Sequence, residues 1–493
     1  MPGIALNEDD SHYFGTRTGQ HLNAETVATW VDQYADTQVR ELLLCPNAMR
    51  TSFDSRVWDP IWRGYDPDGP DDQPLLASLK AEDRPRARGW VHTAWQLARD
   101  GIDVYEVWIN RARDRGLSPW LTMRMNDLHG VDDEACFMHS EFWRAHPEYR
   151  RVPYRFTSWP DRAFDYGRAE VREYHLRLVQ ELAERYDLDG LELDWMRFGY
   201  HFRPGHEAEG AALLTDFTAE ARRLLDRWEQ RRGHRIRLGA RVPSRPQTAL
   251  GLGMDAVGWA RRGLVDWLVV TPFWASIETD MPLEVWRGLL EGIGTTLCAG
   301  LEVLVRPFPA YPAHLMNSLE TVRGAAAAML ERGADRVYLF NYMDGETAMA
   351  DVEHDYGTLL REVGSLESLQ GKRRRHVVTY ADTWAPGEPE GYALPAAIGA
   401  GRWRAFRLPT GPAPTSSAVV ALGLQEGTAA TLEVRVNGTV CPASGPVSPR
   451  EPVPTFPLNG FAVPSGVLHQ GTNVVELLAR EAVTVGWVEI AVD

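Results

Sequence analysis

The stretch Tyr186–Arg197, with the sequence YDLDGLELDWMR, decides the expected fold. A helical pattern over about 168–186 runs into a short β-type segment, Gly190–Trp195, that carries two acids. Side chains at positions i and i+2 of a strand point the same way, so Glu192 and Asp194 share one face and the leucines share the other. Two carboxylates on one buried face are costly unless they have partners or a function. Acids at the carboxyl end of a strand that follows a helix are typical of the active-site end of a (β/α) barrel.

Short β-type runs alternate with longer helical runs up to about residue 365. Strict alternation of eight such pairs favours a closed (β/α)8 TIM barrel over an open sheet. One long helix is expected over about 92–115, and two insertions, at about 47–90 and 127–165, are expected to wall the pocket. The expected strands are Gly3–Leu6, Val39–Cys45, Pro119–Met125, Gly190–Trp195, Arg235–Val242, Val265–Thr271, Thr295–Leu301 and Arg336–Asn341.

The character of the chain changes after the basic run Gly371–Arg375. We interpret this run as a solvated connector between domains rather than as an anion-binding site. From about residue 376, short alternating segments such as Ala430–Val436 replace the helical pattern, and Asn437-Gly438 predicts a tight hairpin turn. The expected α/β architecture is therefore a barrel over 1–370 followed by an all-β, jelly-roll-like sandwich over 376–493.

Length and charge exclude several classes of protein. The 493 residues suffice for a barrel and a smaller module, and the net charge of −16 argues against nucleic acid or anionic membranes as partners. We find no apolar run of about 18 residues and no signal peptide, which predicts a cytoplasmic protein, or a secreted one if a leader was trimmed. The four cysteines lack CxxC spacing and are expected to be buried thiols. A homo-oligomer is compatible with the sequence.

Active sites of such barrels lie at the carboxyl ends of the strands, so the acids there are the first candidates. Asp194 lies at the mouth of its strand and Glu302 follows the seventh strand, which predicts a carboxylate pair. This interpretation requires Asp194 to face solvent. Glu192 lies one layer deeper and is either a third candidate that tunes the pair or a structural partner of Arg124 or Arg241.

Other residues at the strand ends suit a carbohydrate ligand, because Arg and Asn hold hydroxyl groups and aromatic rings stack on sugars. The hydroxyl-binding candidates are Arg124, Asn126, His129, Arg197, Arg241 and Asn341, and the stacking candidates are Trp195, Trp274 and Tyr342. No P-loop, GxSxG, HExxH or GxGxxG motif implies a cofactor. Asp9, Asp10 and His12 are only a weak metal signal, so we assign no metal and rank a metal-dependent barrel enzyme last.

The run EVREYHLRLVQELAERYDLDGLELDWMRF over 170–198 resembles the fourth-strand signature of bacterial glycosyl-hydrolase-like (β/α)8 barrel proteins. In those proteins a helix, Tyr-Asp-x-Asp-Gly and a strand ending in Asp recur. Val337–Tyr342, at the eighth strand, extends the resemblance. It implies a glycoside hydrolase that cleaves an O-glycosidic bond in an oligosaccharide or glycoside with a pair of carboxylates.

The segment DGLELDWM is also similar to the DGxDxDxE motif of family 18 chitinases. Asp189, Glu192 and Asp194 match its earlier acidic positions, but Met196 stands where the final acid should be. Methionine cannot donate a proton, so chitinase-type hydrolysis is not expected. The missing acid motivates a second interpretation, a carbohydrate-binding or scaffolding barrel that has lost catalysis.

Overall fold

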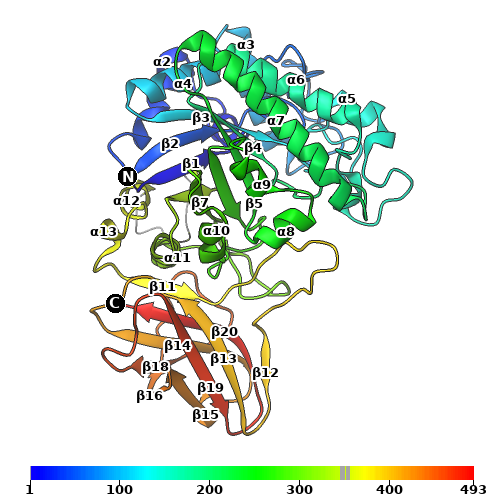
Figure 1. Cartoon of the computed structure of the whole chain (residues 1–493). Helices are drawn as coiled ribbons and strands as arrows, with labels where there is room; N and C mark the ends of the chain where they lie inside the picture. The colour runs from blue at the N-terminus through cyan, green and yellow to red at the C-terminus, as the bar shows by residue number, and fades with distance from the viewer. Residues whose placement is uncertain (1, 345–349, 351–355) are drawn as a thin grey trace.

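The computed structural model describes residues 2–344, 350 and 356–493. Eight parallel strands close into a barrel in the order β1-β10-β7-β6-β5-β4-β3-β2 (Figure 1), which confirms the predicted (β/α)8 fold. The strands are β1 (Ile4–Glu8), β2 (Val39–Leu44), β3 (Ser118–Arg124), β4 (Gly190–Asp194), β5 (Arg237–Pro243), β6 (Trp267–Thr271), β7 (Thr296–Leu301) and β10 (Arg336–Phe340). A short hairpin of β8 (Leu304–Val305) and β9 (Leu315–Met316) follows β7.

Helices surround the barrel, and one prediction about them was wrong. The single helix expected over about 92–115 is two helices, because Gly101 adopts a left-handed conformation with φ 75° and Asp103 caps a new helix through the Glu106 amide. The α-helices of this domain are α1 (His12–Thr16), α2 (Ala24–Thr29), α3 (Arg84–Arg99), α4 (Val104–Asp114), α5 (Glu141–Ala145), α6 (Ala169–Arg185), α7 (Glu207–Arg232), α8 (Pro246–Gly251), α9 (Ala256–Arg261), α10 (Leu283–Leu289), α11 (Leu319–Glu331), α12 (Tyr356–Glu362) and α13 (Leu366–Leu369).

Two tryptophans fill the lower half of the barrel interior. The rings of Trp120 in β3 and Trp267 in β6 lie 5.0 Å apart and are fully buried. Glycines on the neighbouring strands make room for them: a Cβ at Gly190 would lie 2.4 Å from the Trp120 ring, and one at Gly239 would lie 3.2 Å from it. The lower interior is therefore a close-packed apolar plug, and polar chemistry is confined to the upper end.

The C-terminal domain consists of two antiparallel sheets, which confirms the predicted all-β character. One sheet has the order β11-β20-β14-β18-β17 with β12 on β20, and the other has the order β13-β19-β15-β16. Asn437 and Gly438 have φ values of 50° and 79° and join β15 to β16, as the hairpin prediction required. The strands are β11 (Arg374–Val377), β12 (Ala396–Ile398), β13 (Arg402–Pro409), β14 (Ala418–Glu426), β15 (Leu432–Val436), β16 (Thr439–Cys441), β17 (Ala443–Pro446), β18 (Leu458–Val463), β19 (Thr472–Ala479) and β20 (Val483–Val492).

The basic run before this domain is only partly a solvated connector. Residues 371–373 are exposed, but Arg374 and Arg375 are buried in β11, so the prediction was wrong for these two. Arg375 forms an ion pair of 2.7 Å with Glu489 on β20. The buried carboxylate of Glu489 on the adjacent strand therefore allows Arg375 to lie within the sheet.

The segment that follows β11 runs back over the barrel. The Asp382 carboxylate accepts backbone N–H bonds of 2.7–2.8 Å from Phe273, Trp274 and Ala275, which form the loop after β6. Glu388 accepts a hydrogen bond from Thr248 in α8. The segment after β11 thus holds the loop that follows β6, at the carboxyl end of the barrel strands.

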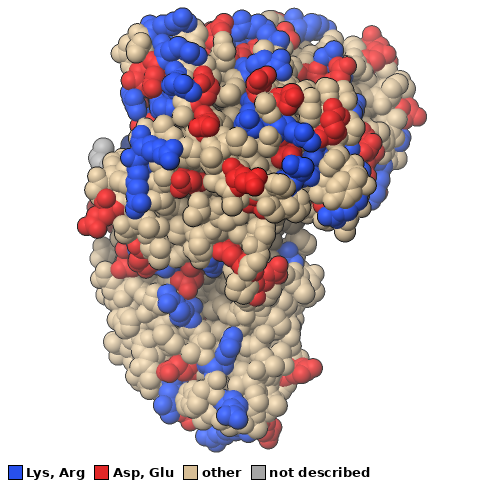
Figure 2. Space-filling view, turned by 45° about the vertical axis from the view of Figure 1, so that its right-hand side comes forward, with Lys and Arg blue, Asp and Glu red and all other residues tan. Residues whose placement is uncertain are grey.

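The surface carries charges of both signs, and the cysteines lie inside the protein. Lys and Arg are interspersed with Asp and Glu over the barrel face in Figure 2, while the lower, C-terminal part of that face carries fewer charges. All four cysteines are buried free thiols, as predicted. Among the described residues, no helix combines the length and apolar character that crossing a bilayer needs.

We predict that Gly190→Ala destabilises the barrel, because its Cβ would overlap the buried Trp120 ring. Overpacking of this kind costs roughly 1–3 kcal/mol of unfolding free energy. Gly288→Ala is the matched control: no atom lies within 4 Å of its Cβ position in α10, and helix propensity predicts a gain of up to about 1 kcal/mol. Urea unfolding followed by far-UV circular dichroism measures both, and equal midpoints for the two variants would contradict the packing account.

Candidate active site

Strand register brings three charged residues to one level of the barrel. Arg124 in β3 pairs with Asp194 in β4, and Asp194 pairs with Arg241 in β5. As the sequence predicted, Leu191 and Leu193 pack on the helix side, while the acids of β4 face the interior. The carboxyl ends of β3, β4 and β5 therefore concentrate ionic groups directly above the tryptophan plug.

One guanidinium connects the two predicted catalytic acids. Nη1 of Arg241 lies 3.2 Å from both oxygens of Asp194, and Nη2 lies 3.0 Å from Oε1 of Glu302, just beyond β7. Asp194 also accepts backbone N–H bonds of 3.0 and 2.9 Å from Met196 and Arg197. The second acid required by the sequence interpretation is thus within reach of the first.

Glu302 is held in a setting that favours its protonated form. Burial raises its pKa from 4.5 to about 8, although Arg241 and Arg197 act in the opposite direction. Among the described residues, none hydrogen-bonds its second oxygen, Oε2. Its backbone carbonyl is fixed by the Asn317 amide at 2.9 Å and by the Tyr342 hydroxyl at 2.7 Å. The result is a positioned carboxylic acid with one free oxygen.

Glu192 lies one layer below and pairs with hydroxyl groups. Its Oε1 accepts hydrogen bonds of 2.8 Å from Thr122 and from Tyr338, and Asn7 in turn donates to the Tyr338 oxygen. The alternative in which Glu192 pairs with Arg124 or Arg241 is therefore wrong. Burial, and next the charge of Asp194, raise its pKa to about 7.

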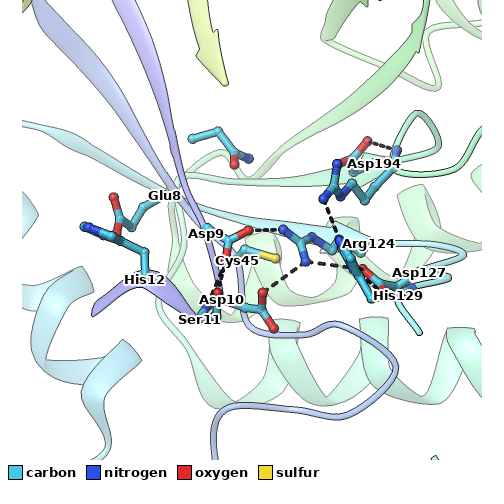
Figure 3. Close-up of polar contacts among 12 residues, drawn as sticks. Glu8, Asp9, Asp10, Ser11, His12, Cys45, Arg124, Asp127, His129 and Asp194 are labelled. Carbon is cyan, nitrogen blue, oxygen red and sulfur yellow. Dashed lines mark hydrogen bonds and ion pairs between the residues drawn. The ribbon is translucent and has the colours of Figure 1, made fainter. Parts of the chain in front are cut away.

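Arg124 is enclosed by three carboxylates, as Figure 3 shows. It donates to Asp9, to Asp10 at 3.0 Å and to Asp127 at 3.2 Å. Arg124 helps to lower the pKa of Asp9 and of Asp127, against their burial, whereas burial raises the pKa of Asp10. The three carboxylates balance the charge of Arg124. Because they lie on the loops after β1 and β3, Arg124 holds these two loops together.

The weak metal signal does not correspond to an assembled site. Asp9 and Asp10 turn toward Arg124, whereas His12 turns to the other side, beside Glu8 (Figure 3). His12 pairs there with Glu8 and with Asp344. Within the described part of the chain, no group of three or more His, Cys, Asp or Glu side chains could hold a metal ion. The three residues of that hypothesis are therefore separated.

His129 and Arg197 form a second polar group at the mouth. Nη2 of Arg197 lies 2.8 Å from Nε2 of His129, and Nδ1 of the same ring lies 2.9 Å from Asp127. Arginine can only donate, so Nε2 must be the acceptor and Nδ1 must carry the proton. The bond pattern thus defines a neutral His129 between an arginine and an aspartate.

An aromatic cluster lines the rim, and sequence reasoning missed most of it. Phe198 contacts Trp159 and Phe273 with ring centroids 5.4 and 5.3 Å apart, and His129 meets Phe198 edge-on at 5.2 Å. Phe198 has a φ of 68°, which is rare for a bulky residue and marks a constrained loop. The aromatic residues of insertion 127–165 were the available signal for Trp159. Trp274, a predicted stacking residue, is 40% exposed beside this rim.

Several predicted ligand-binding residues do not face the mouth. Trp195 is fully buried behind β4 against Tyr166 and Phe217. Asn126 uses its amide to hold the backbone of Phe164 and Tyr200. The Tyr342 hydroxyl supports Glu302 from behind, and Asn341, with φ 62°, is half-buried at the end of β10.

The mouth is closed over the carboxylates in this structure. Asp194 is 1% exposed and Glu302 is 0% exposed, so the expectation that Asp194 faces solvent was wrong. The ion pairs with Arg241 explain how two acids tolerate this burial. A ligand can reach them only if the side chains of the rim shift.

Comparisons with known proteins find only remote similarity, to solved structures. No protein-family model and no curated protein matches it. Similar solved structures include alpha-L-fucosidase isoenzyme 2 from Paenibacillus thiaminolyticus (TM-score 0.44, 12% identity, 73% of this chain and 48% of that chain). Another is the PgaB (BpsB) glycoside hydrolase domain from Bordetella bronchiseptica (TM-score 0.42, 13% identity, 74% of this chain and 99% of that chain). A third is the GH36 alpha-galactosidase AgaA from Geobacillus stearothermophilus (TM-score 0.38, 14% identity, 97% of this chain and 55% of that chain).

The chain spans about half the length of the fucosidase and of the galactosidase. A likeness this remote carries no argument about activity.

We predict that the contribution of Glu302 to protein stability falls as pH rises, because the folded state keeps a proton on Glu302 that the unfolded chain releases. The pKa of Glu302 is 4.5 ordinarily and about 8 when folded, so its contribution is complete below about 4.5 and lost by about 8. Glu302→Gln should lose less stability than the wild type between pH 5 and 8 in urea unfolding.

Glu209→Gln, an exposed substitution on α7, is the matched control and should follow the wild type. Some pH dependence should remain in Glu302→Gln, because the pKa of Glu192 is also raised, to about 7. Identical pH slopes for Glu302→Gln and the wild type would show that Glu302 is already ionised in the folded protein.

Proposed function

We propose that this barrel hydrolyses O-glycosidic bonds, with Glu302 as general acid and Asp194 as nucleophile or general base. The observation that carries the proposal is the single Arg241 guanidinium that holds acids from two strands side by side in different surroundings. Glycoside hydrolysis needs two such carboxyl groups, one protonated and one ionised.

The two acids fit different roles. Asp194 only accepts hydrogen bonds, from two backbone amides and Arg241, which is the pattern of a carboxylate that can attack an anomeric carbon or activate water. Glu302, with its pKa raised by burial to about 8, keeps a proton at neutral pH. Its unpartnered Oε2 is the atom that would protonate the leaving oxygen.

The separation of the two acids is compatible with the chemistry. The bonds to Nη1 and Nη2 and the width of one guanidinium fork limit the distance between the carboxyl groups to roughly 9 Å. Retaining enzymes use about 5–5.5 Å and inverting enzymes about 6.5–9.5 Å. The anomeric configuration of the first product, observed by NMR, distinguishes the two.

Access to the pair requires a movement at the rim. Phe198 and Phe273 come from the loops after β4 and β6 and contact each other beyond the strand ends. A sugar ring that replaces this contact would stack between aromatic faces and reach Asp194 and Glu302 beneath. Hydrolysis on this account includes a rim that opens for substrate.

A carbohydrate-binding barrel without turnover is the second candidate, and the enclosure of Asp194 is the observation that favours it. Both candidates predict glycan binding. Only the hydrolase predicts reducing-end formation on a panel of aryl glycosides and of plant, fungal and bacterial polysaccharides.

We predict that Asp194→Asn and Glu302→Gln each lower kcat by about 10²–10⁴-fold while the far-UV spectrum is unchanged. Loss of the acid should matter most when the leaving group is poor. Glu302→Gln should therefore be more active, relative to wild type, on dinitrophenyl glycosides than on alkyl glycosides. Asp189→Asn, at the opposite end of β4, is the control and should retain activity. Normal turnover by Asp194→Asn would show that Asp194 is neither the nucleophile nor the general base.

We also predict that kcat/KM falls as pH rises above about 8, since the general acid must be protonated and the pKa of Glu302 is about 8. The pH–rate profile of the wild type on an alkyl glycoside measures this limb. A falling limb centred near pH 5 would mean that another group supplies the proton.

A further inference from the structure

Three arginines converge on the barrel mouth, and two of them form ion pairs with carboxylates. Arg124 contacts three acids, and Arg241 bridges Asp194 and Glu302. Nε of Arg241 has no hydrogen-bond partner in the described chain, but both of its Nη atoms contact a carboxylate. These two cations explain how charges are buried here, and they leave the third arginine, Arg197, to be explained.

Arg197 is a buried cation without an ion-pair partner in the described part of the chain. It is 7% exposed, and among the residues that the structure describes no carboxylate lies within ion-pair distance of its guanidinium. Its Nε has no hydrogen-bond partner in the described chain, and Nη2 donates to His129. His129 is neutral by the bond pattern, so it offers no compensating charge.

The structural alternative is that aromatic contacts alone retain Arg197. Its guanidinium lies 5.2 Å from the Phe198 ring centre and 5.7 Å from that of Phe340. Such contacts recover only part of the cost of burying an ion, which is why buried arginines usually have carboxylate partners. Burial and the nearby Arg124 indeed lower the pKa of Arg197. The aromatic contacts orient the cation, and carboxylates offset its charge only from beyond ion-pair distance, with Asp127 and Asp9 contributing most.

We propose that Arg197 binds an anionic substituent, a carboxylate or a sulfate, on the sugar that occupies this mouth, so that the substrate class is acidic glycosides. The identity of the ligand as a sugar rests on the proposed function. The empty Nε position and the planar fork of arginine suit an oxyanion held through two parallel bonds.

The position of Arg197 determines which sugar carries the charge. Its own backbone N–H binds Asp194, so its guanidinium lies one side chain away from the carboxylate pair. The anion therefore belongs to the ring at the scissile bond rather than to a distant unit. Repulsion is limited there, because Glu302 retains its proton and Asp194 is paired with Arg241.

The test measures binding separately from turnover. Isothermal titration of the Glu302→Gln protein compares matched ligands: methyl glucuronide with methyl glucoside, methyl galacturonide with methyl galactoside, and galactose 6-sulfate with galactose. We expect at least one acidic member to bind about tenfold or more tightly than its neutral counterpart, and less tightly as salt is added. The first two pairs test the carboxylate and the third tests the sulfate.

Arg197→Gln should abolish that preference, so that the acidic and neutral members of each pair bind alike. Glutamine can still donate to His129, and Arg223→Gln on the exposed face of α7 is the matched control. Because Arg197→Gln removes a buried charge that has no ion-pair partner in the described chain, it should melt at or above the wild-type temperature. Arg197→Lys, which keeps a charge, should retain part of the preference and serves if the glutamine variant does not fold.

The outcomes separate this inference from the proposed function. Equal binding of acidic and neutral partners in all three pairs, or an acidic preference that survives Arg197→Gln, would overturn the inference even if neutral glycosides are hydrolysed. Acidic sugars that bind through Arg197 but are never cleaved as glycosides would support the inference and overturn hydrolysis.

Discussion

The candidate site depends on one ionic contact, the bridge that Arg241 makes between Asp194 and Glu302. All three groups are essentially buried, and removing one partner of such an arrangement typically costs about 3–5 kcal/mol, because a buried charge is left alone. Below it, Trp120 and Trp267 fill the barrel with apolar surface. The ionic layer therefore rests on a rigid base, and its acids lie at the end of β4 and directly after β7, which fixes their mutual geometry.

Burial sorts the acids of the mouth into two protonation states. Glu192 and Glu302 have raised pKa values because little solvent reaches them. Asp9 has a lowered pKa because Arg124 is its neighbour, and Asp127 has one because His129 and Arg124 are its neighbours. The side chains thus provide neutral proton donors and ionised acceptors within one enclosed volume. Acid–base chemistry requires this separation, and it arises from the distribution of arginines rather than from residue type.

The barrel and the inward-facing acids could be predicted from the sequence because they follow from strand periodicity and chain alternation. The same periodicity puts Trp195 on the outward-facing side of β4 together with Leu191 and Leu193. The sequence was therefore sufficient to exclude Trp195 from the barrel mouth. Asn126 was not: its amide is captured by backbone from two distant loops. Phe198 was not predictable either, since its place at the rim depends on a left-handed backbone that phenylalanine rarely adopts.

The charge of Arg197 links recognition to catalysis. Arg197 lowers the pKa of Glu302 through space, and burial, assisted by the charges of Asp382 and Asp194, keeps that pKa above neutrality. An anion that pairs with Arg197 would offset this cation and so favour the protonated form of Glu302 until the leaving oxygen takes the proton. A neutral sugar would leave Arg197 unpaired and would stabilise the acid less. The same contact that selects an acidic ring would then also prepare the proton donor, so specificity should appear in kcat as well as in KM.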